Sequence, residues 1–141
     1  MGPLQRWFLF AVIGVHKALF RLSDGRVGGR LGAQRILLLT TTGRNSGRPR
    51  TVPLTYFEDG ERLVLIASAG GAPSDPAWWK NLQKHPEAVV QIGAEHRRVR
   101  ARIASSEERA RLWPRVKHEN PAYAEYERRT TRAIPVVLLA P

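Results

Sequence analysis

Three arginines and two glycines gather in the short stretch Gly43-Arg44-Asn45-Ser46-Gly47-Arg48-Pro49-Arg50. Glycine lets the backbone turn its N–H groups toward a ligand, and the resulting concavity favours anions. Arginine adds planar donors of fixed charge that suit phosphate or carboxylate. The stretch lacks both the ending of a P-loop and the spacing of a dinucleotide-binding loop. Its composition predicts an anion-binding loop. A hairpin loop that is basic only because the whole chain is basic remains the alternative.

No other group of residues indicates covalent, acid–base or metal chemistry. The chain has no cysteine, so it has no thiolate nucleophile and no disulfide. No serine occupies a nucleophile elbow, and we expect no metal site because the histidines lack metal-ligand spacing. These histidines are His16, His85, His96 and His118. Any redox chemistry would therefore come from an organic cofactor.

Short strands and helices must position the anion-binding loop. The apolar run Ile36–Leu39 leads into the loop, and an alternating strand leaves it. Asp75 is expected to cap a helix over residues 76–84, and Ser105 with Glu108 predicts a capping box for a helix to about Lys117. Asn120-Pro121 predicts a further helix to about Arg129. The expected strands are 35–42, 49–57, 62–68, 87–93, 96–104 and 134–139.

Hairpin connections between these six strands favour a barrel over an open parallel sheet, because the strands do not alternate with crossover helices. Gly60 is expected to form the turn of one hairpin. Arg98, Arg100 and Arg102 alternate with apolar residues and share one strand face, for which a solvated outer barrel face is the favoured interpretation. The fold class predicted is α+β, with mostly antiparallel strands, inserted helices and an N-terminal helix.

Residues 4–22 form the predicted N-terminal helix, which is apolar over most of its circumference. The apolar run Trp7–Val15 is far shorter than the roughly 20 residues that span a bilayer, and basic residues flank it. A helix lying in a membrane interface and a helix packed on protein both fit this pattern. A Gly/Arg loop follows, so we divide the chain into residues 1–34 and a barrel domain over residues 35–141.

A net charge of +11 on 141 residues predicts attraction to polyanions such as nucleic acid, anionic lipid or an acidic cofactor. Specific nucleic-acid binding is disfavoured because no aromatic residues alternate with the arginines of strand 96–104 to form a stacking platform. We expect a cytoplasmic protein that can associate peripherally with the inner face of the cell membrane. The sequence leaves the oligomeric state open.

From Arg35 onward the chain resembles the deazaflavin-dependent nitroreductase family of actinobacterial oxidoreductases. The resemblance rests on TTTGRNSGRPRTVPLTY (40–56), ASAGGAPSDPAWWKNLQKHPEAVVQIG (67–93), EERARLWP (107–114) and NPAYAEYERRTTRAIPVVLL (120–139). It implies a split β-barrel of the FMN-binding type and the cofactor F420, a deazaflavin with a phosphate and an oligoglutamate tail. The implied activity is hydride transfer from reduced F420 to a flat electron acceptor such as a quinone or a nitroaromatic compound.

The resemblance also implies roles for particular residues. Tyr123 and Tyr126 would act on the substrate side as catalytic residues, although the pattern alone favours a pair of core tyrosines. Ser68 would be a third catalytic residue, in a loop that approaches the deazaflavin ring through backbone and hydroxyl contacts. One of the two adjacent tryptophans is expected in the core and the other at the cofactor. The residues implied in cofactor binding are Arg44, Asn45, Ser46, Arg48, Arg50, Val52, Pro53, Ala67, Ser68, Ala69, Gly70, Trp78, Trp79 and Asn81, with Leu54 beside them.

Three positions depart from the family pattern. Asn45 and Ala69 stand where lysine is frequent, and Asn120 stands where some relatives have tyrosine. The lost lysines weaken the electrostatic attraction for the tail, and the lost tyrosine bears on substrate preference. Two alternatives remain: an FMN-binding split-barrel oxidoreductase, and a non-catalytic protein that binds a cofactor or another polyanion.

Overall fold

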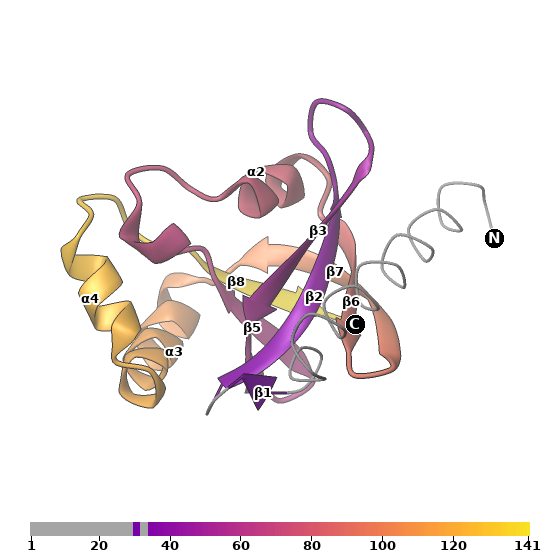
Figure 1. The fold of residues 1–141 in the computed structure, drawn as a ribbon. Coiled ribbons are helices and arrows are strands. Elements are labelled where there is room, and N and C mark those ends of the chain that lie inside the picture. The colour runs from indigo at the N-terminus through magenta and orange to yellow at the C-terminus, as the bar shows by residue number, and fades with distance from the viewer. Residues whose placement is uncertain (1–29, 32–33) are drawn as a thin grey trace.

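A computed structural model describes residues 30–31 and 34–141 of the chain. Its strands and helices follow the order shown in Figure 1. The elements are β1 (Arg30–Leu31), β2 (Gln34–Thr42), β3 (Pro49–Thr55), β4 (Phe57–Asp59), β5 (Arg62–Ile66), the short 3-10 helix η1 (Ala69–Gly71), α2 (Ala77–Lys84), β6 (Glu87–Ile92), β7 (Glu95–Ile103), α3 (Ser106–Glu119), α4 (Ala122–Arg128) and β8 (Val136–Ala140).

The strands form one antiparallel sheet in the order β1-β2-β6-β7-β8-β5-β4, and β3 pairs with β2. No ladder joins β3 to β4 or β5 in the described part of the chain, so the sheet curls into a barrel that stays open between them. The predicted α+β split barrel is thereby confirmed. All six expected strands are present, and the described sheet has eight strands because β1 is added and the expected strand 49–57 is divided at Tyr56. The Tyr56 N–H still pairs with β2, donating to Arg35 O at 3.1 Å, and Phe57 begins the pairing with β5.

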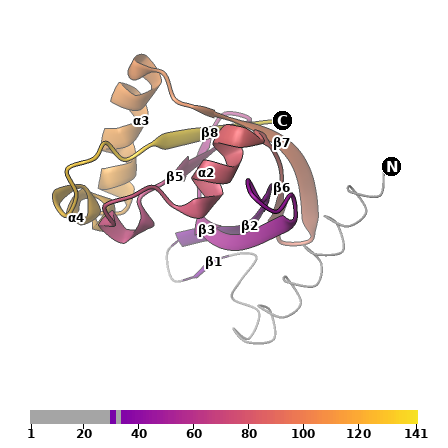
Figure 2. The same cartoon turned by 90° about the horizontal axis from the view of Figure 1, so that it is seen from above.

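The barrel interior holds the larger of two hydrophobic cores. Alternate residues of the strands point inward, as the two-residue period of a strand requires, and Leu37, Leu39 and Leu65 are fully buried there. Helix α2 lies across one end of the barrel and contributes Trp78, Trp79 and Leu82 to the same core (Figure 2). The helix is therefore anchored by its apolar side chains, and this anchoring fixes its position over the mouth of the barrel.

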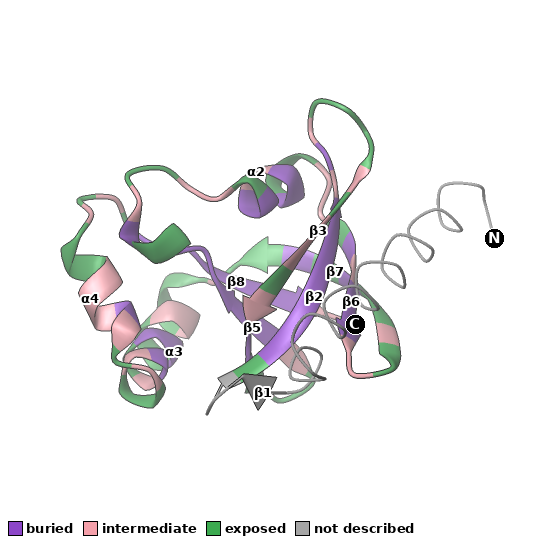
Figure 3. Ribbon diagram, in the orientation of Figure 1, coloured by how far each residue is buried: buried purple, intermediate pink, exposed green. Residues whose placement is uncertain are grey.

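A second core lies between the outer face of the sheet and the helix pair α3–α4. Leu112 and Val116 of α3 pack with Val64 of β5 and Leu138 of β8, and all four are buried (Figure 3). The capping box that opens α3 is confirmed. Ser105 Oγ accepts from Glu108 N at 3.2 Å, and Glu108 Oε1 accepts from Ser105 N at 2.9 Å.

Two local predictions have different outcomes. Asp75 does not cap α2: the helix begins at Ala77 without a side-chain cap, and the Asp75 carboxylate instead accepts from Arg132 Nη1 at 2.8 Å. The competing guanidinium is a charged donor and forms the stronger hydrogen bond. The turn at Gly60 is confirmed, with φ of 62° between β4 and β5.

The predicted N-terminal helix over residues 4–22 and most of the 1–34 segment lie outside the described residues. Within the described part, no helix is both long enough and apolar enough to cross a membrane. The outward arginines of β7 are exposed, and two of them form ion pairs: Arg100 with Glu87 and Arg102 with Glu108. This confirms a solvated outer face for that strand.

Candidate active site

The loop between β2 and β3 is closed by its own backbone. Gly43 N donates to Arg48 O at 2.8 Å, and Gly47 N donates to Gly43 O at 2.8 Å. Gly47 has φ of 69°, where a side chain would be strained. A Cβ atom on Gly43 would lie 2.7 Å from Ser46 Oγ and 3.1 Å from Arg48 O, so a side chain at this position would displace the Ser46 hydroxyl. The two glycines therefore determine the shape of the loop.

Asn81 of α2 attaches this loop to the barrel. Its Oδ1 accepts from Arg44 N at 3.1 Å and from Arg44 Nη1 at 3.0 Å, and its Nδ2 donates to Thr41 Oγ1 at 3.0 Å. Asn81 and Thr41 are buried, so these hydrogen bonds have little competition from water. Lys84, one turn further along α2, donates to Arg44 O at 2.8 Å. The Arg44 backbone and guanidinium are thus both held in place by α2.

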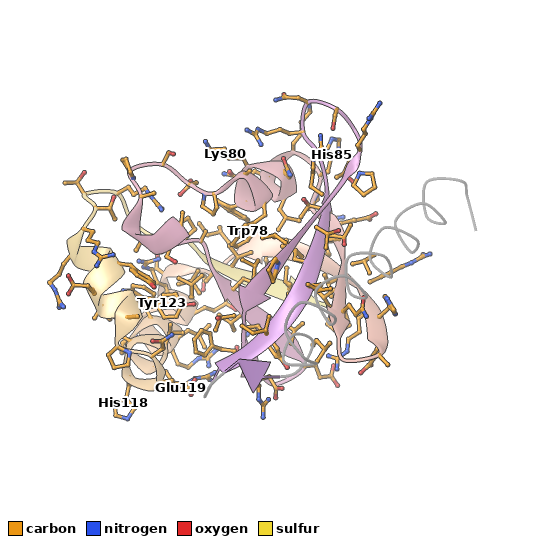
Figure 4. The ribbon with its side chains drawn as sticks, in the orientation of Figure 1. Trp78, Lys80, His85, His118, Glu119 and Tyr123 are labelled. Carbon is orange, nitrogen blue, oxygen red and sulfur yellow. The ribbon has the colours of Figure 1, made fainter. Side chains whose placement is uncertain are left out.

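A cavity of about 420 Å³ lies between the loop, β3 and the start of α2. This volume is in the range of small-molecule sites, about 300–1,000 Å³. One wall is polar and cationic, and the other is apolar. The lining residues are Thr41, Gly43, Arg44, Asn45, Ser46, Arg50, Thr51, Val52, Pro76, Ala77, Trp78 and Asn81. In Figure 4 Trp78 lies beneath α2, between the helix and the strands.

Cations without a carboxylate partner in the described residues lie on the Gly43–Arg50 loop and on α2, and two of them, Arg44 and Arg50, line the cavity. Most arginines in residues 35–141 form ion pairs with aspartate or glutamate. The arginines of the Gly43–Arg50 loop and the lysines of α2 form no ion pair in the described part of the chain, so their positive potential is not neutralised. These cations are Arg44, Arg48, Arg50, Lys80 and Lys84; Arg98 and Arg109, which also have no ion pair there, lie on β7 and α3.

The structure separates the predicted cofactor residues into two groups. Seven of the predicted fourteen line the cavity: Arg44, Asn45, Ser46, Arg50, Val52, Trp78 and Asn81. Pro53 is exposed on the opposite face of β3, because neighbouring strand residues alternate. Leu54 packs against the barrel core, and Arg48 is exposed on the loop. Both tryptophans are buried in that core, and Trp78 also lines the cavity.

The second group lies between β5 and α4. It comprises Ala67, Ser68, Ala69 and Gly70 with the two predicted catalytic tyrosines, Tyr123 and Tyr126. A Cβ atom on Gly71 would lie 2.8 Å from Tyr126 O, which shows how closely the Ser68–Gly71 turn packs on α4. The rings of Tyr123 and Tyr126 meet edge to face, with centroids 5.6 Å apart. These residues do not line the 420 Å³ cavity.

Tyr123 is a member of the outer hydrophobic core. Its ring is in edge contact with Phe57 and Trp113, and 7% of its surface is exposed. Burial raises the pKa of the Tyr123 phenol to about 12, although a hydrogen bond with the Thr55 side chain opposes the rise. The phenol therefore keeps its proton at neutral pH and can act as a hydrogen-bond donor.

Arg132 was missed by the reasoning from sequence. Its guanidinium donates to the carbonyl oxygens of Ala67, Ser68 and Ala72 and to the Asp75 carboxylate. Nothing in the spacing around Arg132 indicates this role, because its partners lie about sixty residues earlier in the chain. The described residues contain no cluster of histidine, aspartate and glutamate that could hold a metal ion.

Comparison with known proteins identifies the family. The family model of F420H(2)-dependent quinone reductases matches residues 13–141. The F420H(2)-dependent quinone reductase of Mycobacterium tuberculosis is 39% identical over 140 residues, 96% of this chain and 94% of that protein.

Two solved structures are similar. One is an F420-H2-dependent reductase, with a TM-score of 0.67 and 39% identity over 74% of this chain and 92% of the other. The second is described as a domain-swapped dimer, with a TM-score of 0.68 and 37% identity over 89% of this chain and 96% of the other. The resemblance to deazaflavin-dependent oxidoreductases is confirmed, and the chain belongs to the F420H(2)-dependent quinone reductase family.

Proposed function

We propose that this protein oxidises reduced coenzyme F420 and passes the hydride to a quinone or a similarly flat electron acceptor. The observation that carries the proposal is the cavity beside the Gly43–Arg50 loop, where unpaired cations face an apolar wall. This combination suits a ligand with an acidic end and a flat, apolar ring. Membership of the F420H(2)-dependent quinone reductase family supports the same conclusion.

The residues of the cavity fit the acidic part of F420. Phosphate and glutamate carboxylates accept hydrogen bonds from guanidinium and hydroxyl groups, and Arg44, Arg50 and Ser46 present these donors on one wall. Since Gly43 has no Cβ, Ser46 Oγ can approach Arg48 N at 3.1 Å. Arg44 is pre-organised by Asn81, so little conformational entropy remains to be lost when an anion binds.

The apolar wall suits the deazaflavin ring. Val52 points into the cavity from β3, and the buried Trp78 faces it from α2. When bound, reduced F420 supplies a hydride to the acceptor. The contribution of the chain is to bind the cofactor, to hold its ring at one orientation and to exclude water. This division of labour accounts for a site without an acid–base or metal constellation.

The tyrosine pair is the proposed acceptor side of the site. The Tyr123 phenol is protonated at physiological pH, as that of an ordinary tyrosine is, and its raised pKa of about 12 keeps it protonated at higher pH as well. We propose that it donates a hydrogen bond to a carbonyl or nitro oxygen that gains negative charge. Ser68 is buried at the start of the turn that packs on α4 and supplies a second hydroxyl donor in this region. We assign Tyr123, Tyr126 and Ser68 to stabilisation of that charge.

Turnover of reduced F420 tests the proposal. Purified protein is mixed with reduced F420 and menadione or a nitroaromatic compound, and the returning fluorescence of oxidised F420 is followed. We expect saturable acceleration by the protein, which a non-catalytic carrier would not give. Separate titrations with F420 and FMN test the cofactor. Tight binding of FMN together with no binding of F420 would refute the proposal.

We further propose that the predicted helix over residues 4–22 brings the enzyme to a membrane surface that contains its acceptor. The support is the Trp7–Val15 apolar run with basic flanks, together with the net charge of +11. Sedimentation with vesicles of anionic lipid tests this, with neutral vesicles as the control. Equal recovery with both vesicle types, or no recovery with either, would contradict it.

A further inference from the structure

Arg132 spans the whole connection between β5 and α2. Its Nε donates to Ala72 O at 2.9 Å, its Nη2 to Ser68 O at 2.9 Å, and its Nη1 to Asp75 Oδ1 at 2.8 Å. Further hydrogen bonds of 3.2 and 3.3 Å reach Ala67 O. Only 16% of the Arg132 side chain is exposed. One guanidinium therefore fastens both ends of residues 67–75, which we call the 67–75 loop.

The backbone of the 67–75 loop is strained at its centre. Ala69 has φ of 46° and is the one non-glycine residue with positive φ in the described part of the chain. Gly70 and Gly71 follow with φ of 65° and 83°. A strained conformation of this kind persists only where surrounding contacts hold it, and such positions concentrate at functional sites. Arg132 and α4 supply the contacts that hold this conformation.

The strained turn also leaves two backbone N–H groups available to bind a ligand. Gly71 N and Ala72 N donate to Ser68 O and Ala69 O, but the N–H groups of Ala69 and Gly70 have no acceptor in the described residues. The backbone of Ser68 is in the right-handed helical region, with φ of −80° and ψ of −34°. The three residues that follow, Ala69 to Gly71, have positive φ. Successive N–H groups in this arrangement converge on one point and favour an oxygen that carries negative charge.

We propose that Arg132 is a positioning residue, which holds the 67–75 loop in the shape that orients the reacting partners. This inference rests on the proposed function, since the loop carries Ser68 and packs on the α4 tyrosines. Cofactor affinity is supplied elsewhere, by the arginines of the Gly43–Arg50 loop. Loss of the clamp should therefore lower kcat while the Kd for F420 changes little.

Two variants and one control test the clamp. Arg132→Lys keeps the charge beside Asp75 but loses the planar fork that reaches three carbonyl groups, and Arg132→Gln loses both. Arg115→Lys is the control: Arg115 is also partly buried and donates to one backbone carbonyl, Glu58 O of β4, which is not part of the 67–75 loop or of its Arg132 contacts. Amide hydrogen exchange, which requires no cofactor, is measured beside kcat, KM for menadione and Kd for F420.

In both Arg132 variants we expect exchange of the hydrogen-bonded amides of Ala67, Gly71 and Ala72 to accelerate at least tenfold. We also expect kcat to fall at least tenfold, with Kd for F420 within threefold of the parent. Arg115→Lys should change none of these. Unchanged exchange in both variants, or faster exchange with an unchanged kcat, would overturn the positioning role. If the parent protein itself shows no turnover, the proposed function fails instead, and the two failures are thereby distinguished.

Discussion

Replacement of Arg44 by alanine is the most informative single change at the site. The Arg44 guanidinium lines the cavity, is held by Asn81 at 3.0 Å and has no carboxylate partner in the described residues. Its removal should spare the fold, because the residue lies in a loop and Asn81 keeps its hydrogen bonds to Arg44 N and Thr41. We expect a change of less than about 1 kcal/mol in the free energy of unfolding.

The expected loss of affinity follows from the kind of hydrogen bond that is lost. A bond between a guanidinium and an anionic oxygen contributes about 1.5–3 kcal/mol, more than a neutral bond. Since 1.4 kcal/mol is a factor of ten in an equilibrium constant, the Kd for F420 should rise roughly 10- to 150-fold. Pre-organisation by Asn81 places the expectation in the upper part of this range, because a fixed donor loses little entropy on binding.

Fluorescence titration of F420 at physiological salt measures this change, because long-range attraction is largely screened beyond about 8 Å under those conditions. Arg98→Ala is the matched control. Arg98 is exposed on β7 and forms no ion pair within residues 35–141. Its replacement by alanine changes the net charge by the same amount as Arg44→Ala does. Equal weakening in the two variants would show that overall charge, and not the loop, binds the cofactor, and the reasoning would be refuted.

Three further predictions concern the loop and the titrating groups. Gly43→Ala displaces the Ser46 hydroxyl and should raise the Kd for F420 about fivefold, the loss of one neutral hydrogen bond of about 1 kcal/mol; an unchanged Kd would contradict this. Hydrogen bonds from Arg111, and then from Arg62, lower the pKa of Asp59 from 3.8 to about 2, so the stability that Asp59 contributes is complete above about pH 4 and disappears as the pH falls toward 2. Calorimetry of Asp59→Asn should give a deficit in Tm against the parent that shrinks over that interval, and a constant deficit would argue against it. Burial raises the pKa of Tyr123 to about 12, so the stability that the neutral phenol contributes is complete below pH 10 and is lost as the pH rises through 12. Tyr123→Phe should therefore remove the part of the phenolate absorbance titration that occurs near pH 12. Loss of absorbance change at lower pH instead would contradict the assignment.

The sequence predicted the architecture where the signals were local. The capping box of Ser105 and Glu108, the turn at Gly60 and the alternation of the strands each depend on a few neighbouring residues, and each was confirmed. The anion-binding loop was inferred from equally local signals, because its glycines and arginines are neighbours in the chain. Gly43, Arg44 and Arg50 of this loop line one cavity, and the binding of an anion there stays a prediction.

Interactions between distant segments could not be predicted from the sequence. Asp75 has the residue type of a helix cap, but Arg132 is a stronger partner that the fold brings to it. At Tyr56 the chain passes from pairing with β2 to pairing with β5, and the sequence of the strand contains no sign of this change. Asn81 was predicted at the site, but its hydrogen bonds with Arg44 and Thr41 depend on the placement of α2 over the barrel.

The central claim is that the Gly43–Arg50 loop grips the acidic end of the cofactor. The most direct test compares the Kd of F420 with that of the same deazaflavin ring lacking the phosphate and the glutamates. Two or more lost charge-assisted hydrogen bonds, at about 1.5–3 kcal/mol each, predict that the truncated ring binds at least about 100-fold more weakly. Equal affinity for the two compounds would contradict the account.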